Sequence, residues 1–403
     1  MKVAFLTPRM IVGGAETYIL SKCNWLIRHG DQAIILSEWG ENVKNIPLGV
    51  KHYIIQSISN PPYALSHSAR KNLIFTISSI LLEEKVDIIE AHNSFPIIYT
   101  LLSYKYHKKP FILNVLNEEA YVGNFQLSCA TVFLNRHKLY FTLTSQMNQY
   151  IEKKIRMPLS PFVIQIPIEV RNTNDAFEEP YILSVCRMSR DKMYVKHLIK
   201  GFAEAKLSKA IPSNITLIIV GEGILFNEIS LMVEELNNNL QDNSIILKGT
   251  VVGDDLHKLY KHCLFYVGMG ITLLTAAAYE KACLLVGMQC KYQPFVWGYW
   301  GNNPSIDKNS IVANRSYTNG ILYKDAIALI VNNSIERHEM ARKAFSLFTV
   351  NYSISSVMNE WQMQYRRVQN TFSVSNMKYI VCMLNLFNSL VHPIYVLFKK
   401  LQH

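Results

Sequence analysis

Two glycine-containing turns are the first residues of this sequence that could take part in chemistry. Gly13 and Gly14 stand before Ala15-Glu16, between an apolar segment and a segment with helical periodicity. Gly268-Met269-Gly270 precedes a second helical segment that starts at Ile271. Glycine lets the backbone approach a ligand closely, and a helix start offers unpaired N–H groups and the positive end of the helix dipole. Both turns are candidate phosphate-binding sites, and the simpler interpretation of each is a tight turn.

Two basic side chains, Arg187 and Lys192, follow a predicted strand over residues 181–185. Ligands of α/β proteins bind at the carboxyl ends of strands. A guanidinium and an ammonium there would neutralise two phosphates, although a solvated basic loop has the same composition. The glycine turns lack the G-x-G-x-x-G spacing, so a nicotinamide dinucleotide is not supported.

A single histidine, His92, stands at the end of another predicted strand, which covers residues 86–90. It lies within the sequence Ala-His-Asn-Ser that follows this strand. This position predicts an imidazole at the edge of a binding cleft. Such a group can hydrogen-bond a sugar hydroxyl or transfer a proton. The alternative is a structural histidine, which is the commoner case for a lone His.

The elements that must position these residues alternate regularly between strand and helix. Apolar runs predict strands, and i, i+3, i+4 spacing predicts the helices between them. The predicted strands cover residues 2–7, 33–37, 86–90, 110–115 and 141–145, and then 181–185, 215–220, 244–248, 264–267 and 283–286. We therefore expect an α/β protein with two tandem, doubly wound Rossmann-like domains that face an interdomain cleft.

The composition changes at two places, which set the expected domain limits. The polar stretch 171–180 is typical of a linker. We expect an N-terminal domain over 1–172, a C-terminal domain over 173–350, a helix over 351–370 that crosses back to the first domain, and a basic apolar tail over 371–403.

The tail has the composition of a membrane-interface segment. Residues 379–398 are largely apolar, and the chain has no acidic residue after Glu360. Two asparagines, a serine, a histidine and Pro393 within that stretch argue against a clean transmembrane helix. We expect a helix that lies on the membrane with Lys399 and Lys400 at the headgroups. The alternative is a helix that packs on the protein.

Composition limits the class of partner. The 403 residues carry a net charge of +11 with only 18% charged residues and 49% hydrophobic residues. This combination favours an anionic membrane surface or phosphorylated substrates, or it serves solubility alone. Nucleic-acid binding fits less well, because the sequence has no dense block of Lys and Arg residues. The seven dispersed cysteines contain no C-x-x-C pair, which indicates a reducing cytoplasm.

Four motifs in the same order along the chain resemble glycosyltransferase family 4, the group 1 glycosyltransferases of GT-B fold. The motifs are Gly13-Gly14-Ala15-Glu16, the strand that ends in His92, residues 182–189 (ILSVCRMS) with Lys192, and Val220-Gly221-Glu222-Gly223. The resemblance covers residues 1–370. It implies a retaining transferase that takes a sugar from a nucleotide donor without a metal or other cofactor.

The resemblance also assigns roles to individual residues. Arg187 and Lys192 would bind the donor diphosphate, Gly268, Met269 and Gly270 would lie beneath it, and Gly13 and Gly14 would lie near the reacting phosphate. His92 would face the donor sugar as the candidate catalytic residue. We expect Glu16 and Asn117 of the first domain to contact the acceptor.

The sequence departs from the family at one functional position pair. The family usually carries two glutamates separated by seven residues, and Val267 and Thr275 occupy the matching positions; Cys186 replaces the family glycine before Arg187. Valine cannot accept a hydrogen bond, and threonine lacks the charge that favours a sugar diol. Either Thr272, Thr275 and backbone amides replace the glutamates, or the chain has lost activity and is a non-catalytic sugar-binding or scaffold subunit.

The function expected from the sequence is a bacterial glycosyltransferase of surface polysaccharide synthesis, such as lipopolysaccharide, O-antigen or capsule. Its acceptor would be a lipid-linked saccharide, and the protein would be peripheral on the inner face of the plasma membrane. A nucleotide-sugar epimerase of the same fold is a weaker alternative.

Overall fold

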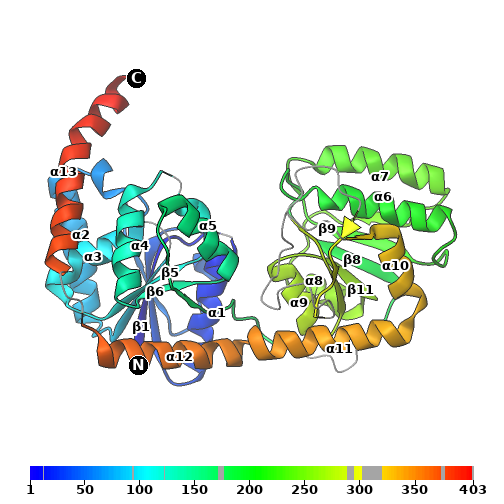
Figure 1. The fold of residues 1–403 in the computed structure, drawn as a ribbon, viewed down its shortest axis with the longest axis horizontal. Helices are drawn as coiled ribbons and strands as arrows, with labels where there is room; N and C mark the ends of the chain where they lie inside the picture. Colours follow the sequence, from blue (N-terminus) through cyan, green and yellow to red (C-terminus); the bar gives the residue numbers. More distant parts are fainter. Residues whose placement is uncertain are drawn as a thin grey trace. The chain divides into compact units, whose positions relative to one another are not determined.

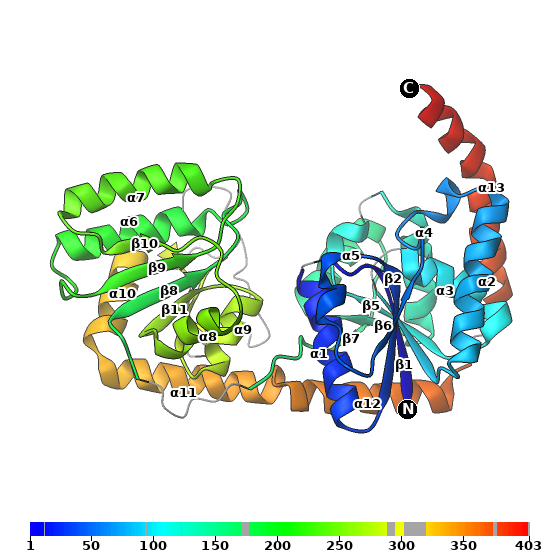
Figure 2. The ribbon, with the colours of Figure 1, turned by 180° about the vertical axis from the view of Figure 1, so that it is seen from behind.

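The computed structural model describes residues 1–11, 13–92, 95–121, 123–170, 177–287, 295–301, 320–373 and 377–401. The chain forms two compact units. One unit consists of Met1–Pro167 with Val357–His403, and the other of Ile168–Ser356 (Figures 1 and 2). The predicted linker 171–180 falls at the start of the second unit, and its residues 171–176 lie outside the described residues.

The first unit contains a seven-stranded sheet in which every neighbouring pair is parallel, with the order β3-β2-β1-β4-β5-β6-β7. Because the order reverses between β1 and β4, the carboxyl ends of these two strands form the topological switch point, where α/β folds bind ligands. The strands are β1 (Lys2–Arg9), β2 (Gln32–Glu38), β3 (Lys51–Ile54), β4 (Ile88–His92), β5 (Phe111–Val115), β6 (Tyr140–Thr142) and β7 (Phe162–Val163).

Helices cover both faces of this sheet (Figure 1). The central strands are therefore continuous apolar runs, as buried parallel strands require. Side chains at three helix starts satisfy free backbone N–H groups: Ser66 caps α2, Asn124 caps α4 and Thr144 caps α5. The helices are α1 (Gly14–Arg28), α2 (His67–Glu83), α3 (Phe95–His107), α4 (Phe125–Arg136) and α5 (Ser145–Ile155), with short 3-10 turns η1 (Glu41–Asn45), η2 (Pro62–Ala64) and η3 (Glu118–Tyr121).

The second unit repeats the same design with the strand order β10-β9-β8-β11-β12-β14. Its switch point lies between β8 (Tyr181–Val185) and β11 (Phe265–Gly268). The other parallel strands are β9 (Thr216–Val220), β10 (Ile245–Leu247) and β12 (Ala282–Leu285); β14 (Gly298–Tyr299) is antiparallel, and β13 (Phe295–Val296) pairs separately with β15 (Ile321–Leu322). The helices are α6 (Tyr194–Leu207), α7 (Phe226–Leu240), α8 (Gly253–His262), α9 (Ile271–Ala278), α10 (Tyr323–Asn332) and α11 (Ser334–Asn351).

Two C-terminal helices pack on the first unit. From α12 (Ile354–Thr371), the side chains of Trp361 and Tyr365 are fully buried. The last helix, α13 (Met377–Leu401), contacts η2, α3 and α4 (Figure 1). The chain thus returns to its first unit after completing the second.

The α/β fold class with two Rossmann-like units is confirmed, and all ten predicted strands are present within a few residues of their predicted limits. Two strands of the first sheet, β3 and β7, are absent from the sequence-based prediction. Both lie at the edges of that sheet, and neither has a fully buried residue. Edge strands need no long apolar run, so the hydrophobic pattern gives little signal for them.

Candidate functional site

The predicted phosphate-binding residues of the second unit lie at its switch point. Arg187 and Lys192 follow β8, and Gly268-Met269-Gly270 ends β11 and leads into α9. These two strands are neighbours in the sheet. The structure therefore brings the two groups to the edge where α/β proteins bind ligands.

Two glycines of the loop after β9 hold the Arg187 loop in place. A Cβ on Gly221 would lie 2.0 Å from the Cys186 carbonyl oxygen, and one on Gly223 would lie 2.3 Å from that of Met188. Both glycines have positive φ angles, and Met188 N donates to Glu222 O at 2.9 Å. The close approach explains the glycines of the Val220–Gly223 motif, because a side chain at either position would push the Arg187 loop away.

Lys192 and Met269 meet directly. The Lys192 Nζ lies 3.5 Å from Met269 Sδ and 3.9 Å from Asp191 Oδ2. Burial lowers the pKa of Lys192, and the positive charge of Arg187 lowers it further against the attraction of Asp191. Arg187 itself is exposed. The edge therefore carries two nearby cations with one partial counter-charge, which suits a dianionic ligand.

In the turn Gly268-Met269-Gly270, both glycines are required by the local geometry. A Cβ on Gly268 would lie 2.4 Å from the Tyr266 hydroxyl, and Gly270 has a φ of +69° at the start of α9. The N–H groups of the first α9 turn thus begin directly after Gly270. This is the arrangement that binds phosphate oxygens at helix starts.

Val267 and Thr275, which occupy the positions of the two glutamates usual in the family, are buried or hydrogen-bonded within the second unit. Val267 is fully buried, and the Thr275 hydroxyl donates to Ile271 O at 2.9 Å. The Thr272 hydroxyl accepts from Tyr266 at 2.6 Å and donates to Met269 O at 3.0 Å. Substrate contacts by Thr272 and Thr275 stay predictions, and any such contact has to use the remaining lone pairs of these hydroxyls.

The corresponding edge of the first unit holds the N-terminal motif. Gly13 caps α1 in an extended conformation, and Gly14 is the first helical residue. A Cβ on Gly13 would lie 2.6 Å from Glu16 Oε2. Glu16 is 8% exposed, and burial raises its pKa. Asn117 is exposed in the loop between β5 and η3. The acceptor roles of Glu16 and Asn117 stay predictions.

His92 is the last residue of β4, which ends two residues later than the predicted limit at residue 90. Its side chain is fully buried between the rings of Phe5 and Tyr18, each 6.0 Å away between centroids. Neither ring nitrogen has a hydrogen-bond partner in the described part of the chain, and Nε2 lies 3.3 Å from Glu90 Oε1. Burial lowers the pKa of His92 to about 4, so the imidazole is neutral at pH 7. Contact with a donor sugar stays a prediction.

A fully buried ion pair lies beside His92. Lys22 Nζ of α1 is 2.7 Å from Glu90 Oε2 and 3.4 Å from the centre of the Trp361 ring. Glu90 also accepts from Asn114 Nδ2 at 2.8 Å and from the Tyr365 hydroxyl. Burial lowers the pKa of Lys22 to about 8, while the Lys22 charge holds the pKa of Glu90 below its usual value. The pair connects α1, the sheet and α12.

The sequence carried a signal for this pair that the motif analysis did not use. Glu90 is an acidic residue within an apolar strand, and Lys22 stands next to Cys23 on the buried face of α1. Each is unexpected in a core position unless the other is present.

The buried histidines predict an acid-sensitive fold. Burial lowers the pKa of His107 to about 4, as it does for His92. The unfolded chain binds these protons below about pH 6.5 and the folded chain only near pH 4, so the free energy of unfolding should fall as pH drops between these values, by up to about 1.4 kcal/mol per unit per histidine. Urea titrations at a series of pH values give the free energy of unfolding as a function of pH. This free energy should fall less steeply with decreasing pH in H92Q than in the wild type, whereas H338Q, at an exposed position, should show the wild-type pH dependence.

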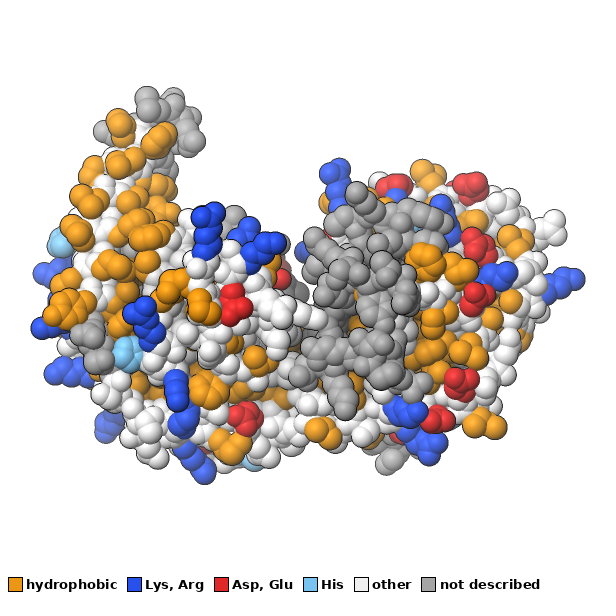
Figure 3. All heavy atoms as spheres, in the orientation of Figure 1, with side chains coloured by type: hydrophobic (Ala, Val, Ile, Leu, Met, Phe, Trp, Pro, Cys, Tyr) orange, Lys and Arg blue, Asp and Glu red, His pale blue; other side chains and the backbone are white. Residues whose placement is uncertain are grey.

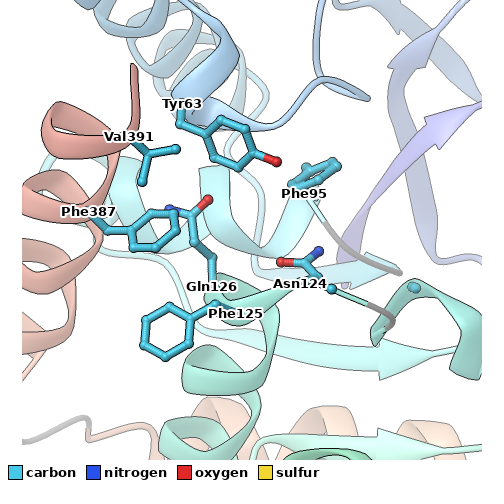
Figure 4. Close-up of a pocket in the computed structure, with 9 residues that line it drawn as sticks. Tyr63, Phe95, Asn124, Phe125, Gln126, Phe387 and Val391 are labelled. Atoms are coloured by element: carbon cyan, nitrogen blue, oxygen red, sulfur yellow. The ribbon is translucent and has the colours of Figure 1, made fainter. Parts of the chain in front are cut away.

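A pocket of about 410 Å³ lies in the first unit between α13 and the loops that precede α3 and α4 (Figure 4). Tyr63, Phe95, Phe125, Phe387 and Val391 form its apolar walls, and Asn124 and Gln126 add two amides. The sequence analysis did not find this pocket, because its walls come from segments more than 250 residues apart.

The described residues contain no group of three or more His, Cys, Asp or Glu side chains that could hold a metal ion. One described helix, Met377–Phe398 within α13, is long and apolar enough to cross a membrane by length and composition.

Comparison with known proteins identifies similar chains. The family model for Glycosyltransferase Family 4 matches residues 12–161. A relative from Campylobacter jejuni is 21% identical over 380 residues, which cover 92% of this chain and 99% of the relative; it is the GalNAc-α-(1→4)-GalNAc-α-(1→3)-diNAcBac-PP-undecaprenol α-1,4-N-acetyl-D-galactosaminyltransferase.

Solved structures give the same fold. A glycosyltransferase from Rickettsia africae is 17% identical with a TM-score of 0.66 and covers 92% of this chain and 99% of its own. HepE from Anabaena in complex with UDP is 14% identical with a TM-score of 0.62 and covers 91% of this chain and 100% of its own. These comparisons confirm the GT-B fold and the resemblance to glycosyltransferase family 4, and they support a transferase enzyme.

Proposed function

We propose that this glycosyltransferase, similar to family 4, moves a sugar from a nucleotide-sugar donor to a lipid-linked saccharide in bacterial surface polysaccharide synthesis. The arrangement of Arg187, Lys192 and the α9 start around one sheet edge carries this proposal. Support for the donor comes from the UDP complex of HepE, and support for the acceptor from the undecaprenol-linked substrate in the name of the Campylobacter relative.

The chemistry follows from the charge of the leaving group. The donor diphosphate gains negative charge as its bond to the sugar breaks. Arg187, Lys192 and the N–H groups at the start of α9 would stabilise this charge more in the transition state than in the bound donor, which accelerates the reaction. We further propose that no metal takes part and that the sugar keeps its anomeric configuration, on the family resemblance.

Isothermal titration with UDP- and GDP-linked sugars, followed by turnover assays with and without EDTA, tests this function. We expect binding of one donor class and EDTA-insensitive sugar transfer. Absence of both binding and turnover across the panel would instead support a non-catalytic subunit, and inhibition by EDTA that Mg²⁺ restores would contradict the metal-free mechanism.

We also propose that the protein lies on the cytoplasmic face of the plasma membrane through α13. The inner face of α13 is buried on the first unit through Ile380, Leu384 and Asn388. Its outer face keeps an apolar stripe in the open, which Figure 3 shows along the helix; the stripe consists of Tyr379, Met383, Leu386, Leu390, Ile394 and Leu397. A surface helix that is apolar on both sides needs a second apolar environment, and the interface of a bilayer supplies it.

Deleting residues 377–403 should therefore move the protein from the membrane to the soluble fraction in flotation assays with anionic vesicles. A matched point variant is L386K/L390K, which charges the stripe and leaves the buried face of α13 intact. We expect both changes to abolish flotation, whereas S389K, at an exposed position beside the stripe, should leave it unchanged. Undiminished flotation of the double variant would refute this anchor.

A further inference from the structure

We infer that the pocket between α13, η2, α3 and α4 binds a neutral sugar ring of the membrane-linked acceptor. This inference rests on the proposed function and specifies where the first unit and the membrane helix together hold the acceptor.

The pocket lies where the fold binds ligands. Phe95 begins α3 shortly after β4, and Gly123 and Asn124 lie between β5 and the start of α4 at Phe125, so the pocket borders the carboxyl edge of the first sheet. Phe387 and Val391 of α13 close it (Figure 4). A ligand in this pocket would therefore contact the same helix that we place on the membrane, and a lipid-linked acceptor lies at that membrane as well.

Specific contacts hold α13 against the pocket. His392 Nδ1 donates to the Tyr63 carbonyl oxygen at 2.8 Å, and Gln126 Nε2 donates to Asn388 Oδ1 at 3.0 Å. Phe387 stacks on Phe125 with 5.4 Å between ring centroids. The pocket is thus a built feature of the unit and not a gap beside a loosely placed helix.

An unpaired buried oxygen indicates the class of ligand. Gln126 lines the pocket and is 1% exposed, and its Oε1 has no hydrogen-bond partner among the described residues. A buried acceptor without a donor is costly, so a ligand that brings a hydroxyl or N–H is favoured. A sugar hydroxyl or acetamido group supplies this donor, whereas a prenyl or acyl chain would leave Gln126 unpaired.

The remaining walls agree with a sugar. Aromatic rings offer flat apolar surfaces to the C–H face of a pyranose, and Asn124 can donate from Nδ2 because its Oδ1 already caps α4. None of the lining residues that the structure describes is Lys, Arg, Asp or Glu, so the pocket favours a neutral ring over a phosphate. The volume of about 410 Å³ is within the range of small-molecule sites.

The first test replaces the unpaired oxygen. In the full-length protein on vesicles that carry lipid-linked saccharides, Q126L should raise the acceptor KM by about tenfold, the loss expected for one buried hydrogen bond, while the donor Kd stays unchanged. N388L breaks the same contact to α13 from a residue outside the lining. Because this contact also holds α13 against the pocket, N388L should raise the KM less than Q126L does, and an equal rise in N388L would overturn the unpaired Gln126 oxygen as the cause.

The second test does not depend on activity. Saturation-transfer NMR with methyl N-acetyl-α-glucosaminide, methyl α-glucoside and farnesyl phosphate measures which probe occupies the pocket. V391W should fill the pocket and remove the sugar signal, whereas V396W, on the exposed side of the same helix, should retain it. Binding of farnesyl phosphate that Q126L leaves unchanged or strengthens, without sugar binding, would overturn the inference and indicate a lipid-chain site.

The two failures can be told apart. If donor binding and turnover are absent but the sugar signal persists and V391W abolishes it, the proposed function fails and the pocket stands. If turnover is normal and neither Q126L nor V391W affects the acceptor KM or the sugar signal, the pocket inference fails and the proposed function stands.

Discussion

Replacing Lys192 by alanine is expected to lower kcat/KM for sugar transfer by about a hundredfold, with most of the effect in kcat. The reason is that the Lys192 ammonium, 3.5 Å from Met269 Sδ, stands between the β8 loop and the start of α9. A cation at this point stabilises the charge that develops on the leaving diphosphate, and loss of one such group typically costs 10²- to 10³-fold. Steady-state kinetics with the donor identified by titration measures the change.

The matched control is K196A. Lys196 lies on the first turns of α6, four residues further along the chain, and forms an ion pair with Glu228. Its removal changes the net charge equally without touching the β8 or β11 loops, so kcat/KM should stay within about twofold. If K192A and K196A have the same activity, Lys192 does not contact the diphosphate. R187A should resemble K192A, because Arg187 stands on the same loop.

The second large effect concerns stability. Replacing Glu90 by glutamine should lower the free energy of unfolding by about 3–5 kcal/mol, because it leaves the buried Lys22 ammonium without its counter-charge. The change also weakens the bond from Tyr365 of α12, so the C-terminal return to the first unit should loosen. Urea unfolding followed by tryptophan fluorescence measures the loss, with Trp361 adjacent to the site.

An exposed ion pair serves as the comparison. K258A removes the partner of Asp255 on α8, where both side chains are more than two-thirds exposed. Such a pair contributes less than about 1 kcal/mol. If E90Q and K258A lower the free energy of unfolding by similar amounts, the buried Lys22–Glu90 pair contributes no more to stability than an exposed pair does. Increased protease cleavage near residues 371–377 in E90Q alone would confirm that Glu90 holds α12.

Much of the fold could be predicted from the sequence because its signals are local. The apolar runs of β1, β8 and β9 and the helical spacing that follows each of them depend on residues within one element. The glycine motif at Gly221 and Gly223 was recognised only through the family resemblance, and the structure supplied its reason, since a side chain at either position would collide with the Cys186–Met188 backbone. From this order alone, the edge of the second sheet was identified as the place for Arg187, Lys192 and Met269.

Only the tertiary structure decided the environment of the chemically important groups. His92 ends its strand as the sequence indicated, yet its side chain is buried because the rings of Phe5 and Tyr18 lie on either side of it. Lys22 and Glu90 are 68 residues apart and become a buried pair through packing, and the pocket at Gln126 exists because α13 returns to the first unit. Burial and pairing depend on what the fold places beside a residue, whereas periodicity and turn chemistry depend on its chain neighbours, so the sequence by itself determined the elements and their order and the packing determined charge, exposure and cavities.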